Sequence, residues 1–148
     1  MTAATNHAPV RTVDGGTPEM VDAVLDAYVA GDTDRYVAMC APDVLLELVA
    51  PMWRFQVVGQ EAMRESLSGE FLEQRRVTEL HVTRTADGVL IDAEAEGVEN
   101  ETHVKWWAMH HVRIDGDHIV EHIAHCSGML DAGQVQRQAT EAPMVRPR

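Results

Sequence analysis

The chain of 148 residues has few basic residues, only two cysteines and no long apolar run. Twelve Lys and Arg against 24 Asp and Glu give a net charge of −12, which disfavours nucleic acid and anionic membranes, because both require a basic partner surface. Two cysteines are too few for a secreted disulfide scaffold. No stretch approaches the roughly 18 apolar residues that span a bilayer, and the N-terminus lacks the apolar core of a signal peptide. We therefore expect a cytoplasmic protein.

The length predicts one domain with a proper core. Residues 1–16 are small and polar and contain Pro and Gly, so they predict a flexible N-terminal segment. Residues 17–142 are expected to form the domain, and residues 143–148 an extended tail. Internal repeats and low-complexity tracts are absent from the sequence.

Helical patterns dominate the first half of the domain. A threonine followed by proline predicts an N-terminus, and a glycine predicts the end, of a helix over residues 17–31. A second, shorter helix is expected to begin at Asp32 or Thr33 and to end at Pro42. A brief strand over residues 44–49 and a connection that contains residues 53–55 then lead to a third helix, roughly over residues 60–74.

The apolar period changes to two after the third helix, which predicts strands. Residues 76–85 and 89–96 alternate as strands with one buried and one wetted face should. Residues 102–126 predict a long hairpin that turns at Asp-Gly-Asp, and a weak helix follows over 131–142. The fold class is thus α+β, with three N-terminal helices packed on a curved antiparallel sheet. Such a sheet would form a conical pocket, the default site for a small ligand.

The hairpin carries six of the eight histidines, and its register decides which of them meet. With a three-residue loop, His110 lies opposite His122 and Trp106 opposite Cys126, all on one face. A two-residue loop would send His122 to the other face, because a slip of one residue inverts a strand. The first register is favoured because it also groups the apolar side chains of Ala108, Val112, Ile114, Val120 and Ala124.

Two facing imidazoles suit acid–base chemistry. A neutral imidazole takes or gives a proton near neutral pH. Like-charge repulsion lets such a pair hold one proton, so it presents one acid and one base. The pair could abstract a proton beside a carbonyl group and return it elsewhere. In the alternative interpretation both are half-exposed strand residues that bond to Glu121, Glu101 or water.

A metal site and a cysteine nucleophile are weaker hypotheses. His110, His122, His125 and Cys126 include the ligand types of zinc, but His125 has the opposite strand parity and the spacing matches no zinc motif. A nucleophilic Cys126 would need a lowered pKa, and a buried structural thiol is favoured. We expect neither a metal nor a cofactor.

Several segments resemble the nuclear transport factor 2-like superfamily. The branch of this superfamily that contains ketosteroid isomerases and polyketide cyclases has segments similar to GDTD, APDV and VVGQEAM, and a last hairpin similar to VRIDGDHIVEHIAH. The resemblance covers roughly residues 17–130. It implies the fold above, but this fold hosts isomerases, cyclases, dehydratases, epoxide hydrolases and binding modules.

The resemblance transfers functional residues only in part. The general base of the isomerases would fall at Leu48 and their oxyanion tyrosine near Val24, so both groups are missing. Their second oxyanion donor would fall at His110, which can also donate a proton. The cyclases pair a histidine on that strand with an aspartate on the last strand, where this chain has His122.

Two other enzyme types of the superfamily use different residues. The histidine of the dehydratases corresponds to His81, and Asp26 is a possible substitute for their aspartate, which would fall near Val29 or Ala30. The Asp-Arg-Asp set of the epoxide hydrolases is not found in the sequence.

The favoured hypothesis is a cofactor-independent acid–base enzyme, of isomerase or cyclase type, that acts on a hydrophobic carbonyl-bearing small molecule through His110 and His122. The alternatives are a non-catalytic small-molecule-binding module and a dehydratase that uses His81 with Asp26. The pocket wall is expected to include Trp106, Cys126, Trp53, Phe55, Leu48, Val24 and Tyr28.

A homodimer is also expected. Trp107 and Met109 are large apolar residues on the outer side of the predicted sheet, where they would suit a subunit interface. The remaining histidines, His7, His103, His111 and His118, are predicted at the surface.

Overall fold

The computed structural model describes residues 11–70 and 75–145. Its helices are α1 (Pro18–Ala30), α2 (Thr33–Ala38), α3 (Gln60–Glu70) and α4 (Ala132–Glu141). Its strands are β1 (Cys40–Ala50), β2 (Trp53–Val58), β3 (Arg76–Thr85), β4 (Gly88–Glu99), β5 (Thr102–Asp115), β6 (His118–Cys126) and β7 (Leu130–Asp131).

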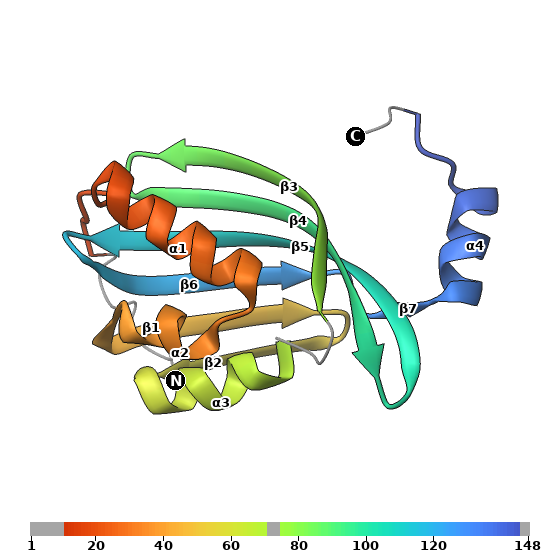
Figure 1. Ribbon diagram of the computed structural model, residues 1–148, viewed down its shortest axis with the longest axis horizontal. Coiled ribbons are helices and arrows are strands. Elements are labelled where there is room, and N and C mark those ends of the chain that lie inside the picture. The colour runs from red at the N-terminus through yellow and green to blue at the C-terminus, as the bar shows by residue number, and fades with distance from the viewer. Residues whose placement is uncertain (1–10, 71–74, 146–148) are drawn as a thin grey trace, which may run out of the picture.

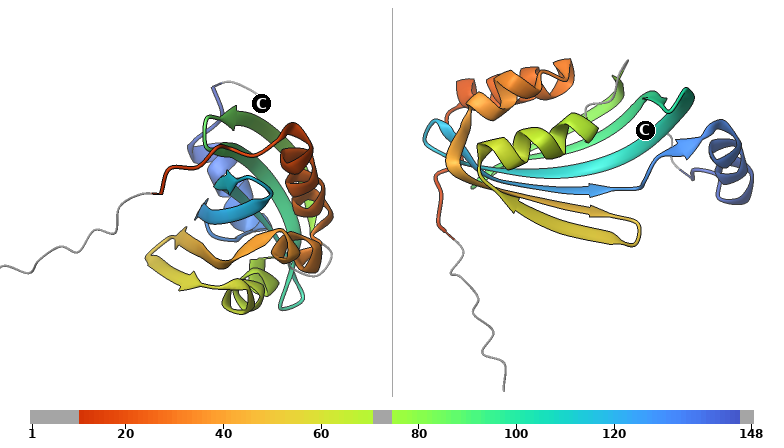
Figure 2. Two further views of the ribbon diagram at one scale, coloured as in Figure 1. Left: turned by 90° about the vertical axis from the view of Figure 1, so that its left-hand side faces the viewer. Right: turned by 90° about the horizontal axis from the view of Figure 1, so that it is seen from below.

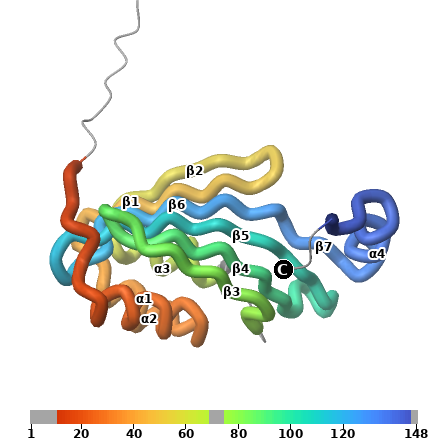
Figure 3. The backbone as a smooth tube through the Cα atoms, turned by 90° about the horizontal axis from the view of Figure 1, so that it is seen from above, coloured from red at the N-terminus to blue at the C-terminus, as the bar shows by residue number. Residues whose placement is uncertain are grey.

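The fold is α+β, as the sequence predicted. The strands form one curved sheet in the order β2-β1-β6-β5-β4-β3, and β7 pairs with β5 (Figure 1). All neighbours are antiparallel except β1 and β6, which run parallel. Helices α1, α2 and α3 lie on one face of the sheet, here called the inner face, and α4 lies beyond the end of the sheet (Figures 2 and 3). The opposite side is the outer face.

The first helix begins and ends where its sequence predicts. The Thr17 side chain accepts a hydrogen bond from the backbone N–H of Met20, and Pro18 occupies the first turn. Gly31 closes the helix in the left-handed conformation, with φ of 66°. The helix buries Val21, Val24 and Tyr28 against the sheet.

Two predictions about the next segment are wrong. Helix α2 ends at Ala38, and Pro42 lies within β1 instead of ending the helix. The pairing of β1 with β6 is interrupted between Cys40 and Leu45, so Pro42 lies where the ladder needs no N–H donor. Residues 53–55, expected as a connection, begin strand β2, which forms a hairpin with β1.

The favoured register of the long hairpin is also wrong, although the two histidines still share a face. The loop has two residues, because Asp115 pairs with His118 and Ile114 with Ile119. A bulge then shifts the ladder by one residue, so that His110 pairs with Ala124 and Val112 with His122. An extra residue in one strand inverts the parity a second time. His110 and His122 are therefore diagonal neighbours on the inner face.

The last residues of the predicted flexible segment lie against this hairpin. The N–H of Gly15 donates to the carbonyl of Ile114, and the Asp14 carboxylate accepts from the N–H groups of Gly16 and Gly116. Residues 1–10, Phe71 with the predicted end of the third helix, and residues 146–148 lie outside the described residues. Within the described residues, no helix is both long and apolar enough to cross a membrane.

The core consists of two apolar clusters on the inner face. The larger one packs α1, α2 and α3 on the sheet and includes Leu46, Ile91 and Val112. The smaller one lies further along β4 and β5 and contains Ala95, Val104, Trp106 and Ala108. On β5 the first cluster ends at Val112 and the second begins at Ala108, so His110 lies between them.

Candidate functional site

Two imidazoles meet in the core beneath the helices. Nδ1 of His110 and Nε2 of His122 are 2.9 Å apart, and the ring centroids are 5.1 Å apart. His110 is 0 % and His122 1 % exposed. The hairpin histidines therefore point inward and contact one another, as the favoured hypothesis requires.

A tyrosine flanks each imidazole. The hydroxyl of Tyr28 is 2.9 Å from Nε2 of His110, and the hydroxyl of Tyr36 is 3.0 Å from Nδ1 of His122. All four ring nitrogens are therefore engaged in the sequence Tyr28–His110–His122–Tyr36, which we call the tyrosine–histidine network. Each buried polar group has a partner, which is the condition for burying it at low cost.

Helix periodicity brings the two hydroxyls to the sheet. Tyr28 lies on the buried stripe of α1 with Val21 and Val24, and Tyr36 is one of the two buried residues of α2. Sequence reasoning placed Tyr28 only in a pocket wall and gave Tyr36 no role. One available signal was that a buried tyrosine hydroxyl needs a partner, and the facing strands offered two inward histidines.

Burial keeps both imidazoles neutral. It lowers the pKa of His122 to about 4, and it lowers the pKa of His110 well below its usual value, assisted by the charges of His122 and Arg75. The Arg75 guanidinium lies 4.8 Å from the centre of the Tyr28 ring and donates to the Tyr28 carbonyl at 2.8 Å. A positive charge therefore lies close to the Tyr28 end of the network.

The network has a direction. A neutral imidazole carries one N–H and one acceptor nitrogen, so the two rings must point their N–H groups the same way along the chain. In one direction Tyr28 donates to His110 and His122 donates to Tyr36; in the other direction every donor and acceptor is exchanged. A concerted shift of protons converts one state into the other and keeps both rings neutral, provided that one terminal hydroxyl receives a proton from outside the network and the other releases one.

A cavity of about 490 Å³ lies on the inner face next to the network. The ladder places Leu48, Ala124 and His110 in one row across β1, β6 and β5, and places Cys126 opposite Ala108 in the next. Leu48 and Cys126 line the cavity, so His110 lies in the row at its edge. The full lining is Leu48, Ala50, Phe55, Ser66, Glu99, Trp106, Cys126, Gly128 and Met129.

The other predicted pocket residues lie elsewhere. Val24 is fully buried in the larger core cluster, and Trp53 is 68 % exposed near the turn between β1 and β2. Glu99, which the sequence analysis did not single out, lines the cavity. The alternation of β4 places it on the same face as Ala95.

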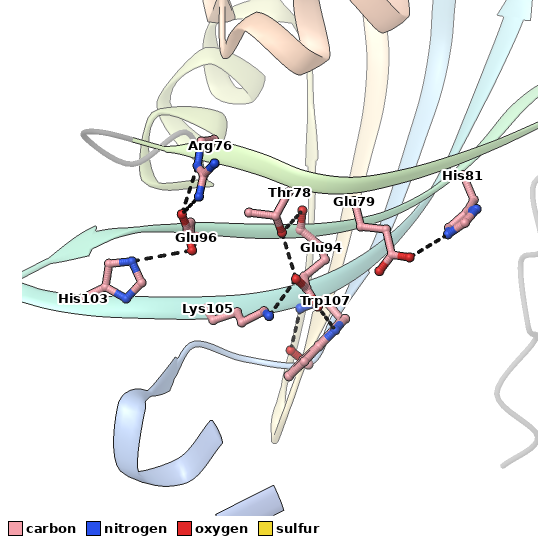
Figure 4. A network of polar contacts seen from close by, with 10 residues as sticks. Arg76, Thr78, Glu79, His81, Glu94, Glu96, His103, Lys105 and Trp107 are labelled. Atoms are coloured by element: carbon pink, nitrogen blue, oxygen red, sulfur yellow. Dashed lines mark hydrogen bonds and ion pairs between the residues drawn. The ribbon is translucent and has the colours of Figure 1, made fainter. Parts of the chain in front are cut away.

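His81 and Asp26 are not brought together. His81 lies on the outer face, opposite Asp92, and bonds to Glu79 at 3.2 Å (Figure 4). Asp26 lies on α1, on the inner side of the sheet, where its side chain is 72 % exposed and 3.8 Å from Arg35. The sheet therefore separates the two residues of the dehydratase hypothesis.

A larger cavity, of about 670 Å³, lies on the outer face beside α4. His125 lines this outer cavity, whereas Cys126 lines the inner one. The two neighbouring side chains therefore lie on opposite faces of the sheet, as the sequence predicted. In the described part of the chain, no group of three or more His, Cys, Asp or Glu side chains is arranged to hold a metal ion.

Known proteins share this sequence pattern and this fold. The family model of the SnoaL-like domain matches residues 21–122, a span that contains all four members of the tyrosine–histidine network. The chain belongs to the SnoaL-like family. This family is part of the nuclear transport factor 2-like superfamily, which the sequence motifs had indicated. A search of curated proteins finds no match.

Solved structures show the same fold at low identity. A candidate polyketide cyclase from Xanthomonas campestris pv. campestris has a TM-score of 0.60 and 18% identity over 72% of this chain and 87% of its own. A phenazine biosynthesis-related protein from Pseudomonas aeruginosa has a TM-score of 0.58 and 12% identity over 88% and 91%. An epoxide hydrolase from M. tuberculosis has a TM-score of 0.56 and 16% identity over 85% and 95%. These similarities establish the SnoaL-like fold. The reaction has to be inferred from the residues of the site.

Proposed function

We propose that this SnoaL-like protein is a cofactor-independent acid–base enzyme, of isomerase or cyclase type, for a hydrophobic carbonyl-bearing small molecule. The observation that carries the proposal is the 2.9 Å hydrogen bond between His110 and His122 at the edge of an inner-face cavity. The cavity offers Trp106, Phe55 and Leu48 as apolar wall, which suits a hydrophobic ligand.

In this proposal His110 protonates the oxygen of the enolate that forms as the α-proton leaves, and His122 relays that α-proton through the network, so that both imidazoles end neutral. Nε2 of His110 bonds to the Tyr28 hydroxyl, so the carbonyl either replaces this hydroxyl or receives its proton. Both imidazoles are neutral at pH 7, so one can act as base while the other acts as acid.

A second candidate function is small-molecule binding without catalysis. It is favoured by the closure of the tyrosine–histidine network on itself, because every ring nitrogen already has a partner within the protein. Neither imidazole lines the inner-face cavity. In this case the network would serve to fix α1 and α2 on the sheet.

Proton exchange at a carbonyl compound separates the two functions. The probe is α-tetralone in D₂O, with loss of its α-protons followed by NMR. The enzyme should accelerate exchange, and His110→Gln or His122→Gln should abolish the acceleration. His103→Gln, an exposed histidine on the outer face, is the matched control, and His81→Ala should also be neutral. Broadening of the tetralone signals without exchange would support the binding module instead.

We also infer that the protein forms a homodimer through the outer face. Helices α1 to α3 cover the inner face only, and Met109 on the outer face is 50 % exposed (Figure 2). Trp107 lies beside it, half-buried. Sedimentation equilibrium tests this inference, with Met109→Glu expected to weaken association because it places a charge in an apolar contact.

A further inference from the structure

The C-terminal helix is built to be stable but contacts little of its own chain. Asp131 and Gln134 form a capping box at its N-terminus. None of its ten residues is buried, and it lies apart from the other helices at the end of the sheet (Figures 1 and 3). Helices of this length are marginal in water without a packing surface. The helix therefore requires a surface that one chain only partly provides.

A hollow of about 670 Å³ separates the helix and tail from the outer face. Protein interiors are packed almost without voids, so this space is not a finished intramolecular contact. On the sheet side it is lined by Trp107 and Met109, and on the other side by Val135, Ala139 and Met144 of α4 and the tail. An apolar group would find partners on both walls.

The floor of the hollow is fixed by one carboxylate. Glu94 accepts hydrogen bonds from Lys105 at 2.6 Å, from Trp107 Nε1 at 2.9 Å and from Thr78 at 2.8 Å (Figure 4). These bonds lower the pKa of Glu94 against the opposing effect of burial. They also hold the indole of Trp107 in place. The positive charge of Lys105 is already paired with Glu94 within the same chain, so a second protein would not need to neutralise it. Covering this floor would thus leave no polar group of the cluster unpaired.

The same patch carries the group that would fill the hollow. Beyond α4, Met144 is 70 % and Val145 102 % exposed, although both are apolar. A surface that presents both a projection and a matching recess is self-complementary under a twofold axis, because each copy contributes both. Geometry therefore favours a second copy of this chain as the occupant.

Charge on the outer face permits this approach, although the chain as a whole carries −12. On this face, strand register places seven carboxylates against four Lys or Arg and five His. The residues are Glu47, Glu79, Asp92, Glu94, Glu96, Asp115 and Glu121; Arg54, Arg76, Lys105 and Arg113; and His81, His103, His111, His118 and His125. Repulsion between two copies is thus smaller here than the net charge suggests.

We propose that Met144 of each copy leaves the rim of its own hollow and inserts, together with Val145, into the hollow beside Trp107 and Met109 of the partner. The C-terminal tail is then an exchanged arm that locks the dimer. This inference rests on the homodimer proposed above and adds the element that holds it together.

Sedimentation equilibrium of paired methionine variants tests the arm. Met144→Asp should raise the dimer dissociation constant at least about tenfold, because it would bury a charge. Met52→Asp is the matched control, since Met52 is 102 % exposed on the turn between β1 and β2. If both variants dimerise like the unmodified protein, the arm is refuted and the dimer stands. A protein that stays monomeric at 200 µM would refute both inferences.

Photo-crosslinking identifies the chain that receives the tail. Benzoylphenylalanine at position 144 attacks nearby C–H bonds, so irradiation should give a covalent dimer, and its cross-linked peptide should contain Trp107 and Met109. A cross-link of that peptide within one chain would show that the tail fills its own hollow. That result would overturn the exchange.

Discussion

Burial of the two neutral imidazoles makes the stability of the fold depend on pH between 7 and 5. His122 has its pKa lowered to about 4, and the pKa of His110 is also well below its usual value. In this range the two histidines are protonated in the unfolded chain but stay neutral in the folded chain. Their contribution to the free energy of unfolding is therefore fully present above the unfolded pKa of 6.5 and is lost as the pH falls. Protonation therefore pulls the protein toward the unfolded state.

The magnitude follows from proton linkage. At pH 5 a histidine with an unfolded pKa of 6.5 and a folded pKa of about 4 has lost about 2 kcal/mol. His110 loses stability in the same direction, because burial also lowers its folded pKa. The loss from His122 alone is already a sizeable part of the 5–15 kcal/mol typical of a whole domain, and His110 adds to it. Carboxylates with lowered pKa, such as Asp87 at about 2, lose their contribution only below about pH 4.

Urea denaturation at pH 5, 5.5, 6 and 7, followed by circular dichroism, measures this slope. Near pH 5.5 His122 alone should change the free energy of unfolding by close to one proton, or about 1.2 kcal/mol per pH unit, and His110 should add to this slope. His122→Gln should remove the part of the slope that His122 contributes, whereas His103→Gln, at an exposed histidine, should leave the slope intact. An equal slope in both variants would show that the buried network does not control the pH dependence, and the reasoning would fail.

Three further variants or reactions test the packing around the site. Tyr36→Phe removes the partner of a buried imidazole nitrogen and should cost about 1–3 kcal/mol in urea denaturation. Iodoacetamide at pH 8 should alkylate Cys126, which lines the inner cavity, and spare Cys40, whose pKa burial raises to about 12, as intact mass would show. Gly88→Ala should sharply lower the melting temperature, because its Cβ would lie 2.0 Å from a backbone oxygen of β5; Gly97→Ala, with 3.5 Å to Trp106, is the control.

Helix ends and strand periodicity could be predicted from the sequence, because they depend on residues close together in the chain. The N-cap at Thr17, the stop at Gly31 and the period-two strands follow from interactions between near neighbours, and all three are confirmed. Pro42 misled the prediction, because proline is excluded from helices and central ladders alike, and only the interruption of β1 pairing accommodates it. The edge strand β2 was missed because its burial is slight.

The sequence predicted correctly that His110 and His122 share a face, but it predicted the wrong hairpin register. A three-residue loop and a two-residue loop followed by a bulge give the same parity, so His110 and His122 reach one face in either case. The bulge depends on tertiary packing and leaves no clear mark in the sequence. The tyrosine partners are non-local in the same way, since Tyr36 and His122 are 86 residues apart.

The tyrosine–histidine network constrains how any catalysis could proceed. Forming an imidazolium at His122 at pH 7 would cost about 4 kcal/mol, given a pKa of about 4. A stepwise mechanism through a charged histidine would therefore have its activation free energy raised by this amount. A concerted shift from Tyr36 to Tyr28, in which Tyr28 releases a proton to the substrate and Tyr36 takes one up, delivers a proton and leaves both rings and both hydroxyls neutral. Activity carried by the network should therefore be independent of pH between 6 and 8, where no member of the pair changes charge. An enzyme that used an exposed histidine would instead lose or gain activity across that range.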